Sequence, residues 1–259
     1  MKITGLLSIV AAAALLGLSA PRGFAQPPTG ASQPQTKPTG APAQPTKKAE
    51  PPKTESPAGE KPTNPPSSEP KLYYVKMTTS QGDIIIELNN EKAPISTRNF
   101  LAYVDKKQYD GTVFHRIIPN FMIQGGGFEA KDGKLVEKST DKPIKNEWQN
   151  GLKNTRGTIA MARTSAPDSA TCQFYINVVD NAALDVPRGG AAYAVFGKVI
   201  AGMDTVDKLK AVPTGTSSGM SDVPKDLGGV TIKSVTRLTE DEAKKLMTSS
   251  PKKEEPAKK

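Results

Sequence analysis

Cysteine and histidine are almost absent from this chain of 259 residues, which contains one of each. The single Cys172 cannot form a disulfide within the chain, so a disulfide framework is excluded. One His and one Cys are also too few for the common zinc sites, which take three or four such ligands from the protein. We therefore expect no metal site of these kinds.

Charge is not concentrated where a nucleic-acid-binding protein would carry it. Residues 71–240 contain 22 Lys and Arg against 18 Asp and Glu, a net charge of +4, whereas the whole chain has +9. A nucleic-acid surface would gather positive charge on the folded domain and intersperse aromatic residues, which make up 5% of the chain. We therefore expect no nucleic-acid partner, and we take a monomer as the expected state.

The first 25 residues have the layout of a secretory signal peptide. Lys2 precedes an apolar run from Ile3 to Ala20, and small residues lead to Ala25, after which we expect cleavage. The alternative is an uncleaved membrane anchor, because about 18 apolar residues reach the lower limit for a span. We expect export to the periplasm or cell envelope, with no membrane span once the signal peptide is removed.

Residues 26–70 and the C-terminal end do not have the composition of folded domains. Thirteen of the 45 residues from Gln26 to Pro70 are Pro, and large apolar residues are almost absent. Such a segment cannot bury enough surface to offset the entropy of ordering it, so we interpret it as an extended spacer. Residues 241–259 are expected to form a charged tail, although Thr239 and Glu242 have the spacing of a helical capping box.

Strand patterns predominate in residues 71–240, which suffice for one domain with a single core. Eight short runs show the strand pattern and are separated by turn residues. They are residues 73–78, 84–88, 111–118, 121–125, 157–163, 173–179, 194–200 and 230–238. Pro94–Lys106 and Met203–Leu209 instead have apolar residues at helical spacing. These patterns favour an all-β sandwich or barrel with a helix at each open end.

An Arg and the only His stand next to each other within one of the apolar strands. In a regular strand Phe114, Arg116 and Ile118 share one face, while His115 and Ile117 share the other. Arg116 then lies on an apolar surface, whether Phe114 and Ile118 face the interior of a barrel or its outer wall. A guanidinium there is costly unless it is paired or meets a ligand.

Two other chemistries can be weighed for this part of the chain. His115 could act as a general base, but a hydrolase would also need an activated nucleophile, and nothing in the sequence marks Cys172 as one. Gly125–Gly127 could cradle a phosphate, but no Gly-Lys-Ser/Thr follows and no dinucleotide-binding spacing is complete. We interpret His115 as a packing or hydrogen-bonding residue and the glycines as a tight bend.

Phe-His-Arg-Ile-Ile-Pro at residues 114–119 is followed by Phe-Met-Ile-Gln-Gly-Gly at 121–126, and further motifs lie at 157–162, 169–176 and 194–199. In this order they resemble the signature of the cyclophilin family of peptidyl-prolyl cis-trans isomerases. The resemblance covers nearly all of the domain. The sequence around residues 161–171 is similar to the exported bacterial branch of the family.

The resemblance implies an eight-stranded antiparallel barrel capped by two α-helices, which binds substrate on its outer face and uses no cofactor. It implies that Arg116 is the catalytic residue and that the partners are proline-containing, unfolded or extended polypeptides. The residues that it implies for substrate binding are Phe121, Met122, Gln124, Ala162, Arg163, Gln173, Tyr175, Leu184 and Tyr193.

Several positions depart from the best-known family members. Tyr175 stands where many members have Phe, and Tyr193 stands where eukaryotic members have His. Ala183 replaces the usual Trp or Phe, which removes an aromatic wall and a hydrogen-bond donor. Tight binding of cyclosporin-type inhibitors is therefore not implied. Cys172 replaces a small, Ser-like residue and is expected to be buried.

Two functions without turnover are alternatives to the isomerase. A tethered proline-binding chaperone or adaptor would hold exported chains in the same pocket, and the long spacer is its best support. A small-ligand barrel of the lipocalin type would need a hollow interior. The many large apolar residues of the strands argue for a filled one.

Overall fold

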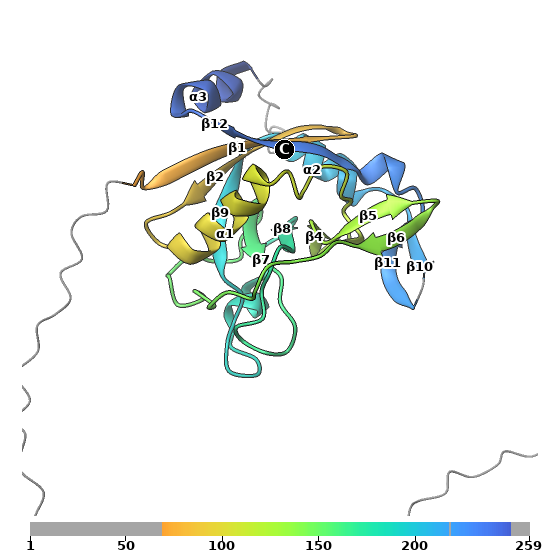
Figure 1. Ribbon diagram of the computed structural model, residues 1–259, viewed down its shortest axis with the longest axis horizontal. Coiled ribbons are helices and arrows are strands. Elements are labelled where there is room, and N and C mark those ends of the chain that lie inside the picture. Colours follow the sequence, from red (N-terminus) through yellow and green to blue (C-terminus); the bar gives the residue numbers. More distant parts are fainter. Residues whose placement is uncertain (1–68, 218, 250–259) are drawn as a thin grey trace, which may run out of the picture. The chain divides into compact units, whose positions relative to one another are not determined.

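The computed structural model describes residues 69–217 and 219–249. The expected signal peptide, the expected spacer up to residue 68 and the last ten residues of the expected tail lie outside the described residues. Strands predominate over helices among the elements of the described part, which contains three α-helices (Figure 1).

Eight of the described strands form one antiparallel sheet in the order β12-β1-β2-β9-β7-β8-β4-β3. The prediction of an eight-stranded sheet is confirmed, and each strand of this sheet overlaps a predicted run. The strands are β1 (Leu72–Thr79), β2 (Gly82–Asn89), β3 (Arg116–Ile118), β4 (Met122–Gly125), β7 (Thr158–Met161), β8 (Phe174–Asn177), β9 (Val195–Ala201) and β12 (Ile232–Leu238). The first two are a hairpin in which Thr79 pairs with Gly82 across a two-residue loop, as their turn residues predict.

The sheet curls until its two ends meet. Val113 and Thr231, which precede the edge strands β3 and β12, form an antiparallel bridge. The Ile232 amide donates to the Thr112 carbonyl at 2.7 Å, and the Phe114 amide donates to the Val230 carbonyl at 3.0 Å. Closure of this kind satisfies backbone groups that an open edge would leave unpaired.

The interior of the curled sheet is filled by large side chains. Phe100, Tyr109, Phe114, Phe174 and Phe196 are fully buried, and the Phe100 ring lies 4.9–5.6 Å from three of the others. A lipocalin-type cavity has no room among them. The same packing leaves the outer face of the sheet as the place for a ligand.

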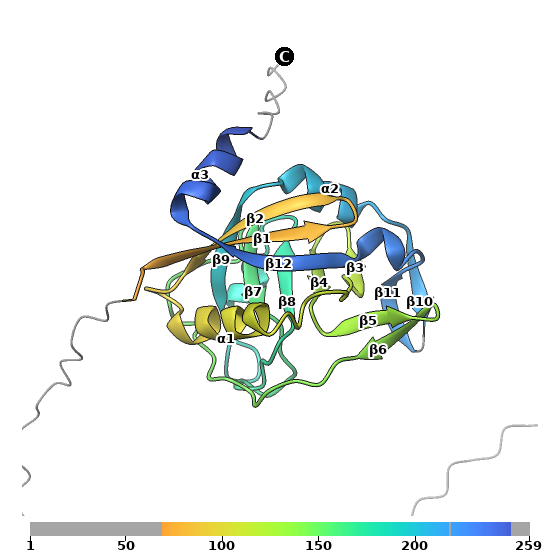
Figure 2. The same cartoon turned by 45° about the horizontal axis from the view of Figure 1, so that its top comes forward.

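Two helices lie on opposite sides of the curled sheet (Figure 2). Helix α1 (Pro94–Asp105) begins with Pro at its first turn and buries Phe100, Leu101 and Val104 in the core. Helix α2 (Met203–Lys210) buries Val206 and Leu209 there. Both positions agree with the apolar spacing of the sequence, so the expectation of two capping helices is confirmed.

The strand that carries the Phe-His-Arg motif is shorter than predicted. Residues 112 and 113 form bridges on both sides, to Glu129 and Thr231, and the chain then leaves regular strand geometry until Arg116. Phe114 consequently points into the core, as Ile117 does, while Ile118 packs on the outer face with Met122. The prediction that Phe114, Arg116 and Ile118 share one face is therefore wrong for Phe114.

Two hairpins that the sequence did not indicate extend from the curled sheet. One pairs β5 (Phe128–Lys131) with β6 (Lys134–Glu137), and the other pairs β10 (Thr214–Ser217) with β11 (Met220–Pro224). Few of their residues are buried, and they lack the alternation of a strand that packs on a core. Short 3-10 helices at Ala182–Asp185 and Gly228–Val230 complete the described elements.

A third helix, α3 (Glu240–Ser249), continues into the range expected to be a tail. The capping box is present: the Glu242 amide donates to Thr239 Oγ1 at 3.3 Å, and the Thr239 amide donates to Glu242 Oε2 at 2.8 Å. Ala243 is buried, so the helix gains stability from packing as well as from its cap. None of the helices in the described residues is long and apolar enough to cross a membrane.

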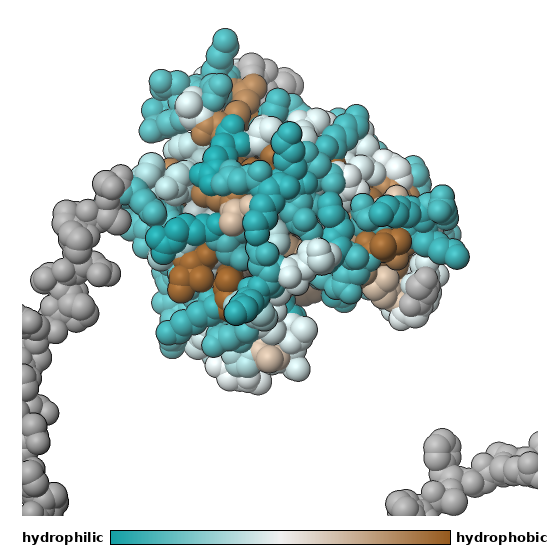
Figure 3. Space-filling view, viewed as in Figure 1, coloured by the Kyte–Doolittle hydropathy of each residue, from teal (hydrophilic) through white to brown (hydrophobic). Residues whose placement is uncertain are grey.

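The surface is largely hydrophilic on the face that Figure 3 shows. The large hydrophobic side chains that remain exposed in the described part of the chain are Val136, Val186 and Met247. They belong to three different segments, and single exposed apolar side chains are ordinary on soluble surfaces.

Candidate active site

The register of three neighbouring strands places the predicted catalytic Arg beside residues from two other motifs. Arg116 on β3 pairs with Gln124 on β4, and Gln124 pairs with Tyr175 on β8. Residues directly opposite each other on neighbouring strands project to the same face of a sheet. The three side chains therefore form a row across the outer face.

A hollow of about 100 Å³ lies over this row. Nine of the ten predicted site residues line it: Arg116, Phe121, Met122, Gln124, Ala162, Arg163, Tyr175, Leu184 and Tyr193. The tenth, Gln173, lies next to it, where its Oε1 accepts a hydrogen bond of 2.8 Å from Gln124 Nε2. The curled sheet thus brings together side chains that lie up to 77 positions apart in the sequence.

The base of the hollow is a small apolar cluster separate from the core. Met122, Ala160, Tyr175 and Val195 are buried in it, and Leu184 packs against them. Met122 is 3% exposed, so its side chain forms a wall and does not project into solvent. An apolar recess of this size suits a compact ring such as that of proline.

Arg116 stands at the edge of the hollow with 45% of its side chain exposed. Its Nε lies 3.6 Å from Oδ2 of Asp222, on β11. The guanidinium is therefore paired loosely and keeps donors available to a ligand.

The Tyr175 hydroxyl is held by a network of buried Asn side chains that the sequence analysis missed. It donates to Asn154 Oδ1 at 2.7 Å, which also accepts from Asn177 Nδ2 at 3.1 Å. Asn181 in turn donates to Asn177 Oδ1 and to the Phe121 carbonyl, each at 2.7 Å. Burial raises the pKa of Tyr175 well above its usual value, so the hydroxyl stays protonated as a donor.

No pattern in the sequence could have identified this network. Asn154, Asn177 and Asn181 lie near turns and strand ends, where Asn is common for local reasons. Their joint role depends on distances that only the folded chain provides.

Arg163 and Tyr193 form the opposite wall of the hollow. The Arg163 guanidinium carbon lies 4.7 Å from the centre of the Tyr193 ring, a cation–π contact. Arg163 also donates to the carbonyls of Ala191 and Ala192, at 2.6 and 3.3 Å, and of Thr164, at 2.8 Å. Its side chain therefore joins two loops and supports Tyr193, in addition to lining the hollow.

His115 does not line this hollow. It is 4% exposed, its ring lies 4.6 Å from that of Phe128, and burial lowers its pKa to about 4, an effect that the neighbouring Arg116 charge reinforces. An imidazole of such low basicity is a poor general base at neutral pH. The packing role predicted for His115 agrees with this position.

The possible nucleophiles are also unsuited to hydrolysis. Cys172 is fully buried, as predicted, and burial raises the pKa of its thiol. Gly215–Gly219 have the Gly-x-Ser-x-Gly spacing of a nucleophile elbow, but Ser217 ends a strand of the β10–β11 hairpin. An elbow requires a strand-to-helix turn.

The glycine run after the active-site strand forms a bend between β4 and β5, as predicted. Gly126 has a φ of +87°, and a Cβ there would lie 2.8 Å from the Phe174 ring. A Cβ on Gly127 would lie 2.6 Å from Gln173. These residues must be Gly because the backbone turns sharply against packed side chains. The described residues contain no group of three His, Cys, Asp or Glu that could hold a metal ion.

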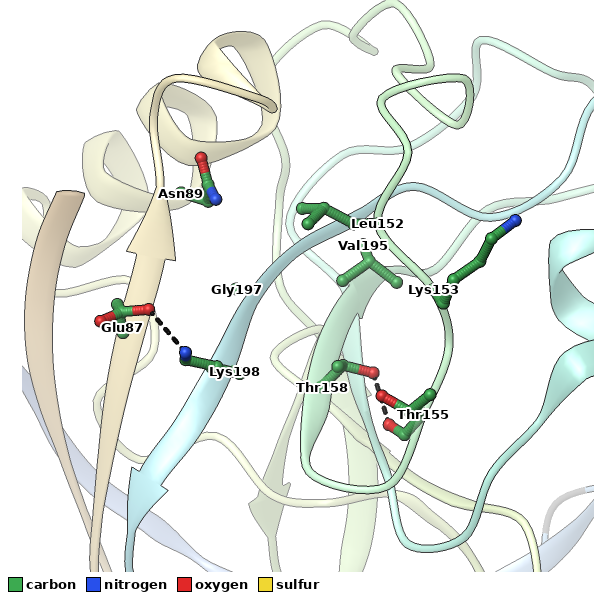
Figure 4. Close-up of a pocket in the computed structure, with 9 residues that line it drawn as sticks. All are labelled: Glu87, Asn89, Leu152, Lys153, Thr155, Thr158, Val195, Gly197 and Lys198. Carbon is green, nitrogen blue, oxygen red and sulfur yellow. Dashed lines mark hydrogen bonds and ion pairs between the residues drawn. The ribbon is translucent and has the colours of Figure 1, made fainter. Parts of the chain in front are cut away.

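A second hollow, of about 210 Å³, lies on another part of the surface (Figure 4). It is formed by β2, β7, β9 and residues 152–155, and an ion pair of 3.2 Å between Lys198 and Glu87 crosses one side of it. None of the ten predicted site residues lines it. Its size alone does not connect it with the chemistry of the outer row.

Comparison with known proteins identifies the family. Residues 74–237 match the family model described as cyclophilin type peptidyl-prolyl cis-trans isomerase/CLD. A peptidyl-prolyl cis-trans isomerase of Acinetobacter baylyi is 62% identical over 151 residues, which cover 58% of this chain and 79% of that protein. Peptidyl-prolyl cis-trans isomerase B of Escherichia coli is 53% identical over 165 residues, which cover 62% of this chain and 98% of that protein.

Solved structures indicate the same family. A crystal structure of a cyclophilin type peptidyl-prolyl cis-trans isomerase of Cryptosporidium parvum has a TM-score of 0.52 at 27% identity and covers 65% of this chain and 99% of its own. A structure of the same protein in the presence of the dipeptide Ala-Pro has a TM-score of 0.51 at 28% identity, with coverages of 64% and 99%. With its curled eight-stranded sheet, its two capping helices and these matches, the chain belongs to the cyclophilin family and is a peptidyl-prolyl cis-trans isomerase.

Proposed function

We propose that the isomerase acts on Xaa-Pro bonds of exported polypeptides in unfolded or extended form, and that Arg116 stabilises the twisted amide. The observation that carries the proposal is the exposed guanidinium of Arg116 at the edge of a hollow with an apolar base. The Ala-Pro dipeptide used with the Cryptosporidium protein supports a proline-containing peptide as the ligand.

The proposal for Arg116 follows from the electronic structure of the bond. Rotation of a peptide bond faces a barrier of about 18–20 kcal/mol because the nitrogen shares its lone pair with the carbonyl. As the bond twists, the lone pair localises on the prolyl nitrogen, and a donor there stabilises the twisted state more than either planar state. Arg suits this task because it remains charged and carries several donors in a fixed fork.

The rest of the hollow would supply binding and orientation. Met122 and Leu184 provide apolar contacts for the ring, and the Gln124–Gln173 hydrogen bond fixes a polar edge beside it. A charge-assisted hydrogen bond contributes about 1.5–3 kcal/mol, which corresponds to about 10- to 100-fold in rate. Any larger acceleration must therefore come from desolvation and anchoring within the hollow.

The decisive experiment compares the wild-type protein with Arg116→Ala in an NMR exchange assay on a short Xaa-Pro peptide. We expect Arg116→Ala to lower kcat/KM by about 10- to 100-fold, because the donor is lost. Arg116→Lys should recover part of the loss, since it restores the charge without the fork. The control is Arg98→Ala, which removes an exposed Arg on α1 whose partner is Glu69. Equal activity of Arg116→Ala and wild type would reject the role of Arg116, and peptide binding without turnover in the wild type would favour the chaperone or adaptor.

The exported location rests on the sequence of the first 70 residues. The Lys2 and apolar-run pattern supports a cleaved signal peptide, and the Pro-rich composition supports a spacer that separates the domain from its N-terminus. N-terminal sequencing of the mature protein should find Gln26 as the first residue. A start before Gln26 together with retention in the membrane would reject cleavage and support an anchored protein.

A further inference from the structure

Arg116 has one ionic partner in the described part of the chain, and it comes from a hairpin far along the sequence. Asp222 lies in β11, which packs against β3, and Figure 2 shows the two strands in the same region. Its Oδ2 lies 3.6 Å from Arg116 Nε, and the guanidinium makes no hydrogen bond to another described residue. Among residues 69–217 and 219–249, Asp222 therefore has the only ion pair or hydrogen bond with the charged end of this Arg.

The backbone at Asp222 is in an uncommon conformation. Its φ is +61°. Among the described residues, the only other non-Gly residues with a positive φ are Lys107 and Asp132. Asp and Asn tolerate this left-handed region better than most residues, but it still has a cost. The hairpin also has a register irregularity between Gly215 and Ser217, opposite this part of β11. The carboxylate that lies near β3 thus belongs to a residue whose backbone departs from regular strand geometry.

The same hairpin forms one wall of a third hollow, which adjoins the candidate active site and differs from the one in Figure 4. This hollow measures about 420 Å³ and is lined by His115, Arg116, Gln124, Phe128, Gln173, Met220 and Ser221. Arg116 and Gln124 line both this hollow and the apolar one. The side chain therefore borders two open spaces, and a long side chain with this exposure loses rotamer freedom when it is held in one direction.

We propose that Asp222 is a positioning residue for Arg116, an inference that rests on the proposed function of Arg116. The carboxylate attracts the Nε edge of the guanidinium from the hairpin side. The two terminal nitrogens then face the apolar hollow, where the prolyl amide binds. Asp222 does not touch the substrate in this arrangement and acts only by narrowing the orientations of Arg116.

The test uses two substitutions that preserve the backbone. Asp222→Asn keeps the size and the tolerance for positive φ but removes the charge, and Asp222→Gly keeps only the tolerance. We expect each to lower kcat by about three- to tenfold, because the donor is less often aligned in the twisted state, with KM within about twofold. The matched control is Asp132→Asn, because Asp132 also has a positive φ, of +50°, but lies in the turn of the β5–β6 hairpin.

A double-mutant cycle separates positioning from a structural role. In the Arg116→Ala background, Asp222→Asn should change kcat by less than about 1.5-fold, since no guanidinium remains to be oriented. A side-chain NMR measurement gives a second signature: the Nε–H signal of Arg116 should shift in Asp222→Asn and stay in place in Asp132→Asn.

Several outcomes would overturn the proposal. They are an unchanged kcat in Asp222→Asn, a rise in KM alone, or an equal loss in the Arg116→Ala background. Arg116→Ala is measured in the same series. If that variant retains wild-type activity, the role of Arg116 itself fails. If it loses activity while Asp222→Asn does not, only the positioning role fails.

Discussion

The buried Asn network beneath the hollow predicts that one destabilising substitution becomes neutral or stabilising when a second one is present. Asn154 is 1% exposed, and its Oδ1 accepts from the Tyr175 hydroxyl and from Asn177 Nδ2. Asn154→Ala leaves two buried donors without that acceptor, and each costs about 1–3 kcal/mol. We therefore expect Asn154→Ala to lower the free energy of unfolding by about 2–6 kcal/mol.

Tyr175→Phe removes only one partner of the same hydrogen bond. Asn154 Oδ1 keeps the bond from Asn177, so the expected loss is about 0.5–1.5 kcal/mol. In the Asn154→Ala background the hydroxyl has no acceptor, so the same Tyr175→Phe change should be neutral or should restore about 1 kcal/mol, because it removes a stranded donor. The double variant should thus be at least as stable as Asn154→Ala alone.

Urea unfolding of the four proteins, followed by circular dichroism, measures these differences if the denaturant slopes agree. A double variant whose loss equals the sum of the two single losses would refute the shared hydrogen bond. A Tyr175→Phe loss as large as that of Asn154→Ala would refute the idea that Asn154 serves two donors. The matched control is Asn150→Ala, which removes a donor to the Val195 carbonyl and an acceptor of the Leu152 amide, both outside the network.

Two further predictions concern pH and packing. Burial lowers the pKa of His115 to about 4, below the usual 6.5, so the unfolded chain takes up a proton first as the pH falls. Stability should therefore drop by about 3 kcal/mol between about pH 6.5 and 4, and His115→Gln should reduce that slope in urea unfolding measured across the range; an unchanged slope would contradict the assignment. Gly197→Ala would bring its Cβ into a clash with the Glu87 carbonyl oxygen and should cost about 1–3 kcal/mol, seen as a lower urea midpoint. Its control is Gly215→Ala, whose Cβ would lie 3.5 Å from Lys225, an ordinary contact. Equal urea midpoints for the two variants would contradict the predicted cost of the clash in the sheet.

Most of the curled sheet and both capping helices could be predicted from local patterns. The strands that bury one face alternate in the sequence, as β1 does, and α1 repeats its buried residues at helical spacing. These elements pack on a core, so their apolar residues recur in the sequence with the period of a strand or a helix. The β5–β6 and β10–β11 hairpins show no such periodicity because few of their residues are buried.

The residues of the candidate site were named from family motifs, and nine of the ten line one hollow. The motifs could not show Asp222, because its hairpin lies outside them and its contact with Arg116 depends on how β11 packs against β3. They also could not show that the Arg163 side chain joins two loops through backbone carbonyls. Contacts to carbonyl groups carry no information about the partner's residue type.

The sequence by itself determined the class of fold, the positions of the main strands and helices, and the motif that carries Arg116 and His115. The tertiary structure decided which of these two side chains is accessible: His115 is buried against Phe128, whereas Arg116 opens to the outer hollow. The physical reason is the break in strand geometry before β3, where bridges to two different segments turn Phe114 into the core. Alternation along a strand specifies faces only while the strand remains regular, and pairing between distant segments determines where it does.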